Sequence, residues 1–114
     1  MTDTIKRLRI YTDEAAYFGD QKVFEVVTTR ARAAKVAGGT VFQAIIGFGH
    51  TPQLHRRHLL DDVQSIVIEI LDEEIKLRDF VGSLSDLEHL GPITLETVEV
   101  LRWPSSSSPA NGDT

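Results

Sequence analysis

Four stretches of the chain alternate apolar and polar residues with the two-residue period of a β-strand. In the first stretch, Leu8 and Ile10 fall on one side, while Arg7, Arg9 and Tyr11 fall on the other. The pattern predicts strands over residues 5–12, 40–46, 64–71 and 93–103.

Two further stretches repeat apolar residues every three or four positions, which is the spacing of a helix with one buried face. Asp20 is placed to cap the first helix, and Gly38 with Gly39 is expected to end it. Asp72 is placed to cap the second helix, which is expected to end at the Gly-Pro pair of residues 91–92. The two apolar stripes are Phe24, Val27, Ala31 and Ala34 in the first helix, and Leu77, Phe80, Val81, Leu84 and Leu87 in the second.

The resulting order of elements, βαββαβ, predicts an α+β domain with the ferredoxin-like fold, in which two helices cover one face of a four-stranded antiparallel sheet. In a monomer the other face of such a sheet would be polar. Here the third strand carries Ile68 on one side and Val67 and Leu71 on the other. Both faces are therefore expected to be covered, and a cyclic homo-oligomer would cover them.

Composition narrows the classes of function. The 114 residues fit one domain, placed here at residues 1–103, followed by a Ser- and Pro-containing tail over residues 104–114 that is expected to be disordered. A net charge of −5 argues against nucleic-acid binding, which needs a basic surface. The absence of cysteine excludes disulfides, a thiol nucleophile and thiolate metal sites. Because neither a signal-like nor a membrane-spanning stretch is visible, we expect a cytoplasmic protein.

The connection between the second and third strands, about residues 49–62, is long, polar and locally basic. His55 and His58 are three residues apart and could share one side of a helical turn, where two imidazoles could bind a divalent metal. The same cluster could instead contact an anion or a partner protein, or simply be solvated. We assign no metal ligand, and we assign to the partner-contacting loop the residues His50, His55, Arg56, Arg57 and His58.

Several short motifs, in this order and spacing, resemble domain-of-unknown-function family 190. That family is similar to the nitrogen regulatory PII proteins and, more distantly, to the CutA proteins. The motifs are Leu8-Arg-Ile-Tyr11, Gly39-Thr-Val41, Gly47-Phe-Gly49, Ile68-Glu-Ile70 with Asp72, and Thr94-Leu-Glu-Thr-Val98.

The resemblance implies a homotrimer with its sheets facing inward and a mobile loop, the T-loop, after the second strand. It also implies that Gly47, Phe48 and Gly49 help to shape a cleft between subunits where an adenine nucleotide binds. We add Gln43 and Arg102 as ligand-binding candidates. Gln43 stands where family members commonly carry arginine, and the lysine-containing phosphate loop of PII proteins has no counterpart before the last strand.

No nucleophile, acid–base pair or cofactor motif stands out, so we expect a regulatory protein and not an enzyme, with no cofactor. The leading interpretation is a sensor that binds a small ligand, such as an adenine nucleotide, and controls a membrane transporter or channel through its loop. One alternative is a CutA-like homeostasis protein that binds divalent metal through His50, His55 and His58. The other is an interaction module without a ligand.

Overall fold

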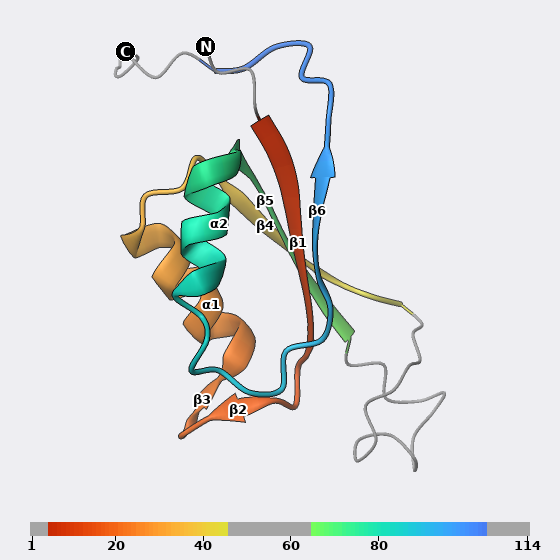
Figure 1. Ribbon diagram of the computed structural model, residues 1–114. Helices are drawn as coiled ribbons and strands as arrows, with labels where there is room; N and C mark the ends of the chain where they lie inside the picture. Colours follow the sequence, from red (N-terminus) through yellow and green to blue (C-terminus); the bar gives the residue numbers. More distant parts are fainter. Residues whose placement is uncertain (1–4, 46–64, 105–114) are drawn as a thin grey trace, which may run out of the picture.

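The computed structural model describes residues 5–45 and 65–104 and has two layers, a four-stranded antiparallel sheet and two helices on one of its faces (Figure 1). The strands lie in the order β4-β5-β1-β6, which confirms the predicted ferredoxin-like fold. The elements are β1 (Ile5–Asp13), β2 (Tyr17–Phe18), β3 (Gln21–Lys22), α1 (Val23–Ala33), β4 (Gly39–Gln43), β5 (Ser65–Glu73), α2 (Glu74–Gly82) and β6 (Ile93–Thr97).

A single apolar core lies between the helices and the sheet. The register aligns its side chains across the strands, because Leu8 of β1 lies opposite both Ile70 of β5 and Leu95 of β6. Fully burying an aliphatic side chain of this size contributes about 1.5–3 kcal/mol. The largest fully buried side chains are Leu8, Ile10, Ile68, Ile70, Leu77, Val23 and Val27.

The start of α1 differs from the prediction, which placed Asp20 at its N-cap. Residues 17–22 instead form the β2–β3 hairpin, whose turn contains Gly19 at a φ of 66° and Asp20. The helix begins at Val23, whose N–H donates to the carbonyl of Ala16 at 2.9 Å. That bond satisfies one of the backbone donors that a helix start leaves unpaired.

The end of α1 also comes earlier than predicted. The helix stops at Ala33, with Ala34 as an exposed C-cap, and Gly39 begins β4. Lys35 takes the left-handed conformation, at a φ of 61°, that a glycine would ordinarily supply at a helix end. Its carbonyl accepts a hydrogen bond from Lys76 Nζ at 2.7 Å, so a contact with α2 accompanies this ending.

The sequence had suggested that Asp72 caps α2, but Asp72 is the penultimate residue of strand β5. Its side chain is buried, and its two carboxylate oxygens accept the N–H groups of Ala37 and Glu73, each at 2.7 Å. Glu73 occupies the N-cap of α2 instead. The carboxylate therefore fastens the connection between α1 and β4 to the end of β5.

Helix α2 is shorter than predicted, because it ends at Gly82 and not at the Gly-Pro pair of residues 91–92. Turns follow it, and they still bury Leu84 and Leu87, so the predicted apolar positions are correct although the helix is not continuous. Arg30 of α1 clamps these turns: its guanidinium bonds the carbonyl of Ser83 at 3.0 Å and both carboxylate oxygens of Asp86.

Strand β6 ends at Thr97, six residues before the predicted boundary at Trp103. Its last pair with β1 is Thr97 with Lys6, one residue from the described start of β1 at Ile5. Residues 98–104 run on past the end of the sheet (Figure 1).

Strands β4 and β5 converge at the place where the chain leaves and re-enters the sheet. The Ala44 N–H donates to the carbonyl of Ser65 at 2.9 Å, directly after the last pair of the ladder, Gln43 with Ile66. The predicted loop and the predicted disorder of the tail fall on residues 46–64 and 105–114, outside the described residues.

Candidate functional site

The sheet face that the helices leave uncovered is the most distinctive surface of the described chain. We call it the open face. The helix-facing side of β1 and β5 is buried, whereas the alternate side chains are only half-buried. The open face comprises Arg7, Arg9 and Tyr11 of β1, Thr40 and Phe42 of β4, Val67, Glu69 and Leu71 of β5, and Thr94 and Glu96 of β6.

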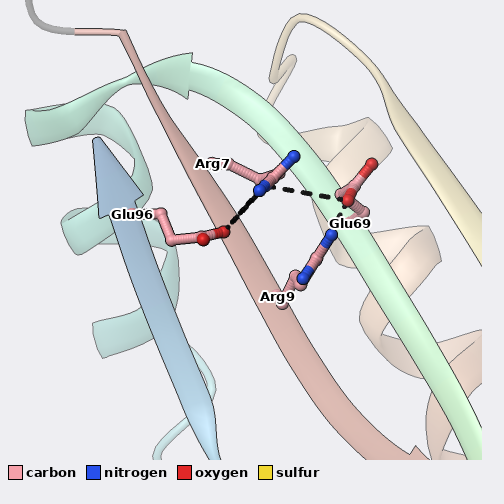
Figure 2. Close-up of polar contacts among 4 residues, drawn as sticks. All are labelled: Arg7, Arg9, Glu69 and Glu96. Atoms are coloured by element: carbon pink, nitrogen blue, oxygen red, sulfur yellow. Dashed lines mark hydrogen bonds and ion pairs between the residues drawn. The ribbon is translucent and has the colours of Figure 1, made fainter. Parts of the chain in front are cut away.

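Two arginines and two glutamates form a connected ion-pair network across three strands of the open face (Figure 2). Arg9 Nε donates to Glu69 Oε2 at 3.0 Å, and Arg7 Nε lies 3.9 Å from the same oxygen. Arg7 also donates through Nε and Nη2 to Glu96 Oε1, each at 2.8 Å. The hydrogen bond to Glu69 raises the pKa of Arg9, although partial desolvation acts in the opposite direction.

The rest of the open face is largely apolar. Tyr11 lies opposite Val67, and Val67 lies opposite Phe42, so these side chains share one row across three strands. Leu71 lies opposite Arg7, beside the charged network. Because the two arginines and two glutamates balance in charge and bond to one another, this surface can be covered by a flat partner without leaving a net charge buried.

Of the predicted ligand-binding residues, the structure describes Gln43 and Arg102. Gln43 ends β4, and its Nε2 donates to Glu14 Oε1 at 3.0 Å. Glu14 also lies 3.4 Å from Lys22 Nζ, so a small polar cluster surrounds this strand end. Gly47, Phe48 and Gly49, together with the loop residues His50, His55, Arg56, Arg57 and His58, lie outside the described residues.

One copy of the chain does not bring Gln43 and Arg102 together. Strands β4 and β6 form opposite edges of the sheet, with β5 and β1 between them. Gln43 lies at the Ile66 end of that sheet, whereas Arg102 follows Thr97 and so leaves from the Lys6 end. The two side chains therefore belong to diagonally opposite corners, and Arg102 is exposed.

Sequence reasoning placed Arg7 and Arg9 on one strand face but missed their partners Glu69 and Glu96, and also Glu14. The signal for these partners was Glu69, which stands between Ile68 and Ile70 in a mainly apolar strand. A partly buried charge in such a strand is usually paired with an opposite charge. Within residues 5–45 and 65–104, no three His, Asp or Glu side chains are grouped to hold a metal ion. In those same ranges, neither helix is long and apolar enough to cross a bilayer.

A cavity of about 250 Å³ lies between α2 and β6. Its lining is mainly aliphatic, and its one charged side chain, Arg78, is already bonded to Glu74 Oε2 at 2.7 Å. We assign it no ligand. It is lined by Leu8, Leu77, Arg78, Val81, Ile93, Thr94 and Leu95.

Comparison with known proteins agrees with the fold and the motifs. The model of family DUF190, described as "Uncharacterized ACR, COG1993", matches residues 5–100. The chain belongs to the DUF190 family. A relative by sequence, the UPF0166 protein of Aquifex aeolicus (strain VF5), is 39% identical over 99 residues, which cover 84% of this chain and 92% of the relative.

Solved structures show that this DUF190 chain has a PII-like fold. The structure of CPII from Thiomonas intermedia K12 bound to ADP and bicarbonate matches with a TM-score of 0.63 and 20% identity, covering 86% of this chain and 89% of CPII. CPII bound to ADP, AMP and bicarbonate, described as a nitrogen regulatory PII-like protein, matches with a TM-score of 0.64 and 19% identity. That match covers 88% of this chain and 96% of CPII.

Proposed function

We propose that this DUF190 protein is a PII-like regulatory sensor. It binds an adenine nucleotide in a cleft between copies of itself and controls a partner protein through the loop at about residues 49–62. The observation that carries the proposal is the shared fold with CPII, whose structures hold ADP, AMP and bicarbonate. The protein acts by binding, and no cofactor or catalytic step is part of the proposal.

The open face supports the oligomer that this function needs. A sheet face with a row of Tyr11, Val67 and Phe42 is more apolar than a permanently solvated antiparallel sheet face requires. A homotrimer, as in the resemblance described above, would bury this face against other copies. The ion-pair network of Arg7, Arg9, Glu69 and Glu96 would then fix the register of the contact, because misplaced charges would be buried without partners.

The positions of Gln43 and Arg102 support a ligand site shared between copies. The proposed ligand residues are Gln43, Gly47, Phe48 and Gly49 from one copy and Arg102 from its neighbour. Gln43 and Arg102 leave opposite corners of one sheet, so a site that uses both needs two copies. A guanidinium suits the phosphate groups of a nucleotide, because it donates two parallel hydrogen bonds.

The partner is proposed to be a membrane transporter or channel, contacted from the cytoplasm. In a chain with a net charge of −5, the residues His50, His55, Arg56, Arg57 and His58 form a local basic segment. Such a segment would attract an acidic surface on the partner. Histidines would make this contact sensitive to pH, since their pKa lies close to physiological values.

Calorimetric titration of the purified protein with ADP, AMP, ATP and cyclic AMP, each with and without bicarbonate, tests the proposal. We expect saturable binding of at least one of these nucleotides, weakened at least about tenfold in Arg102→Gln, which is the loss of one charged hydrogen bond. Arg32→Gln, an exposed arginine on α1, is the matched control and should bind as the wild type does. The absence of heat with all four nucleotides would exclude the nucleotide sensor.

A further inference from the structure

The segment after β6, residues 98–104, has the composition of a strand but lacks one to pair with. We call it the C-terminal arm. Valine, leucine and tryptophan favour strands, and the arm reads Val-Glu-Val-Leu-Arg-Trp before Pro104. In the described part of the chain it pairs with no strand, and the Leu101 side chain is 90% exposed. Val98 and Val100 are half-buried and residues 101–104 are exposed, so the arm has strand composition but no strand beside it in the described chain.

The outer edge of β4 also lacks a neighbouring strand in the described chain. Its five residues are all exposed, and no strand of the described chain lies beyond it. Natural proteins protect such edges with lysine, proline, bulges or inward charges. Strand β4 reads Gly-Thr-Val-Phe-Gln and carries none of those side chains, while Val41 and Phe42 add apolar surface. An edge built in this way is suited to being covered by another strand.

The arm cannot readily cover the β4 edge of its own chain. It leaves from β6, and β1 and β5 separate β6 from β4. A second copy removes this obstacle, because the arm of one copy can reach the β4 edge of the next. The lengths agree, since β4 spans Gly39–Gln43 and the arm offers residues 98–103. Charge does not oppose the contact: Glu99 and Arg102 balance in the arm, and β4 has no charge.

We infer that the C-terminal arm of one copy adds to the outer edge of β4 of the next copy as a fifth strand. Each copy then donates one strand and accepts one, which is a head-to-tail contact that closes into a ring if the rotation between copies permits. Backbone hydrogen bonds supply the pairing, and alternate side chains of the arm supply its register. The inference rests on the proposed homo-oligomer, but it concerns which segments hold the copies together.

Trp103 provides a native probe, because it is the only tryptophan in the protein. Light scattering on the full-length protein gives the oligomer mass, and fluorescence of the same sample reports the surroundings of the arm. We expect an oligomer whose tryptophan emission lies to the blue of the urea-unfolded chain. Val41→Lys, which puts a charge on the β4 edge, should shift the emission to the red and lower the mass. Ile75→Lys, at an exposed apolar position on α2, should leave both unchanged.

Cross-linking identifies the edge directly, since the protein has no cysteine of its own. Thr40→Cys/Leu101→Cys, bridged by a short bis-maleimide, should give covalent multimers on a denaturing gel. Ile75→Cys/Leu101→Cys, with the first cysteine at an exposed position of α2 outside the open face, is the matched control and should give none between copies. An oligomer with solvent-exposed Trp103 and no Thr40-dependent multimers would overturn the arm inference alone. A monomer at high protein concentration would overturn both this inference and the proposed sensor oligomer.

Discussion

The Cβ atom that Gly91 lacks would lie 3.0 Å from the carbonyl oxygen of Tyr11. The two backbones are hydrogen-bonded at this point: the Gly91 N–H donates to Tyr11 O at 2.6 Å, and the Tyr11 N–H donates to Pro92 O at 3.0 Å. These bonds hold the connection between α2 and β6 against the end of β1. Close approach, and not a special backbone angle, explains the glycine at position 91.

Gly91→Ala is expected to destabilise the protein by about 1–3 kcal/mol, because the added methyl group meets backbone that cannot move without breaking these bonds. Gly82→Ala is the matched control. No atom lies within 4 Å of its missing Cβ, and it ends α2, so alanine should stabilise by about 0.4–1 kcal/mol. Urea unfolding of both variants measures the two free energies of unfolding. Equal effects of the two substitutions would contradict the close contact.

Leu77→Ala is expected to cost about 2–5 kcal/mol, because Leu77 is fully buried between α2 and the sheet and its truncation leaves a cavity. Ile75→Ala on the same helix should change the free energy of unfolding by less than about 0.5 kcal/mol in the monomer, since Ile75 is 69% exposed. Denaturant unfolding at a protein concentration low enough to dissociate any oligomer checks both values. A similar loss in the two variants would mean that the face of α2 is assigned wrongly.

Asp72→Ala is expected to destabilise by about 1–3 kcal/mol, because the N–H groups of Ala37 and Glu73 lose their acceptors. Asp72→Asn keeps one acceptor oxygen and should lose less. Hydrogen exchange of the Ala37 amide gives a local readout, and it should become faster in Asp72→Ala. An unchanged exchange rate at Ala37 would show that the carboxylate does not hold this connection.

The Arg30–Asp86 ion pair is expected to stabilise the protein in a pH-dependent way. The hydrogen bond from Arg30 lowers the pKa of Asp86 below its ordinary value of 3.8, although partial desolvation opposes the shift. The stabilisation is therefore complete above pH 3.8 and is lost as the pH falls through the lowered pKa of the folded state.

Thermal unfolding of the wild type and of Asp86→Asn checks this dependence. The variant should melt at a lower temperature at about pH 7, and the difference should shrink as the pH falls through the lowered pKa of folded Asp86. Asp79→Asn, an exposed aspartate on α2, is a suitable control and should show no such convergence. A difference between wild type and Asp86→Asn that persists at the acidic end would contradict the ion-pair explanation.

Glu69→Gln is expected to weaken self-association at least about tenfold, because it leaves Arg9 and Arg7 without their shared carboxylate on the face that the proposed oligomer covers. Glu96→Gln should have a smaller effect, since within the described residues Glu96 pairs with Arg7 alone and its side chain is 44% exposed, compared with 22% for Glu69. Sedimentation equilibrium gives both association constants. A larger loss in Glu96→Gln would contradict this order.

The sequence was sufficient to predict the fold because its signals are local. Alternation in β1 and β5 and the apolar stripes of both helices are visible within windows of about ten residues. The β2–β3 hairpin was missed because strands of two residues show no period. Boundaries were wrong where contacts outside the local pattern accompany them: α1 begins where the Val23 N–H meets the Ala16 carbonyl, and the paired part of β6 ends with Thr97 opposite Lys6.

The candidate site was less accessible from sequence. The face shared by Arg7 and Arg9 follows from the strand period, but their pairing with Glu69 and Glu96 depends on register between strands that are distant in the chain. Gln43 lies inside the strand predicted over residues 40–46, whereas β4 ends at Gln43, and no local pattern could show that Arg102 leaves from the opposite corner of the sheet. Strand order is a property of the whole fold, so the separation of Gln43 from Arg102 within one copy became apparent only from the structure.

The hydrogen bond from Ala44 to Ser65 has a consequence for how this protein can evolve. The chain leaves the sheet and returns to it at one bonded pair of neighbours, so the geometry of the two ends is independent of how many residues connect them. Closing a connection of twice the length costs only about 0.6 kcal/mol more. Insertions and deletions between these two residues can therefore accumulate at little thermodynamic cost while the sheet stays unchanged.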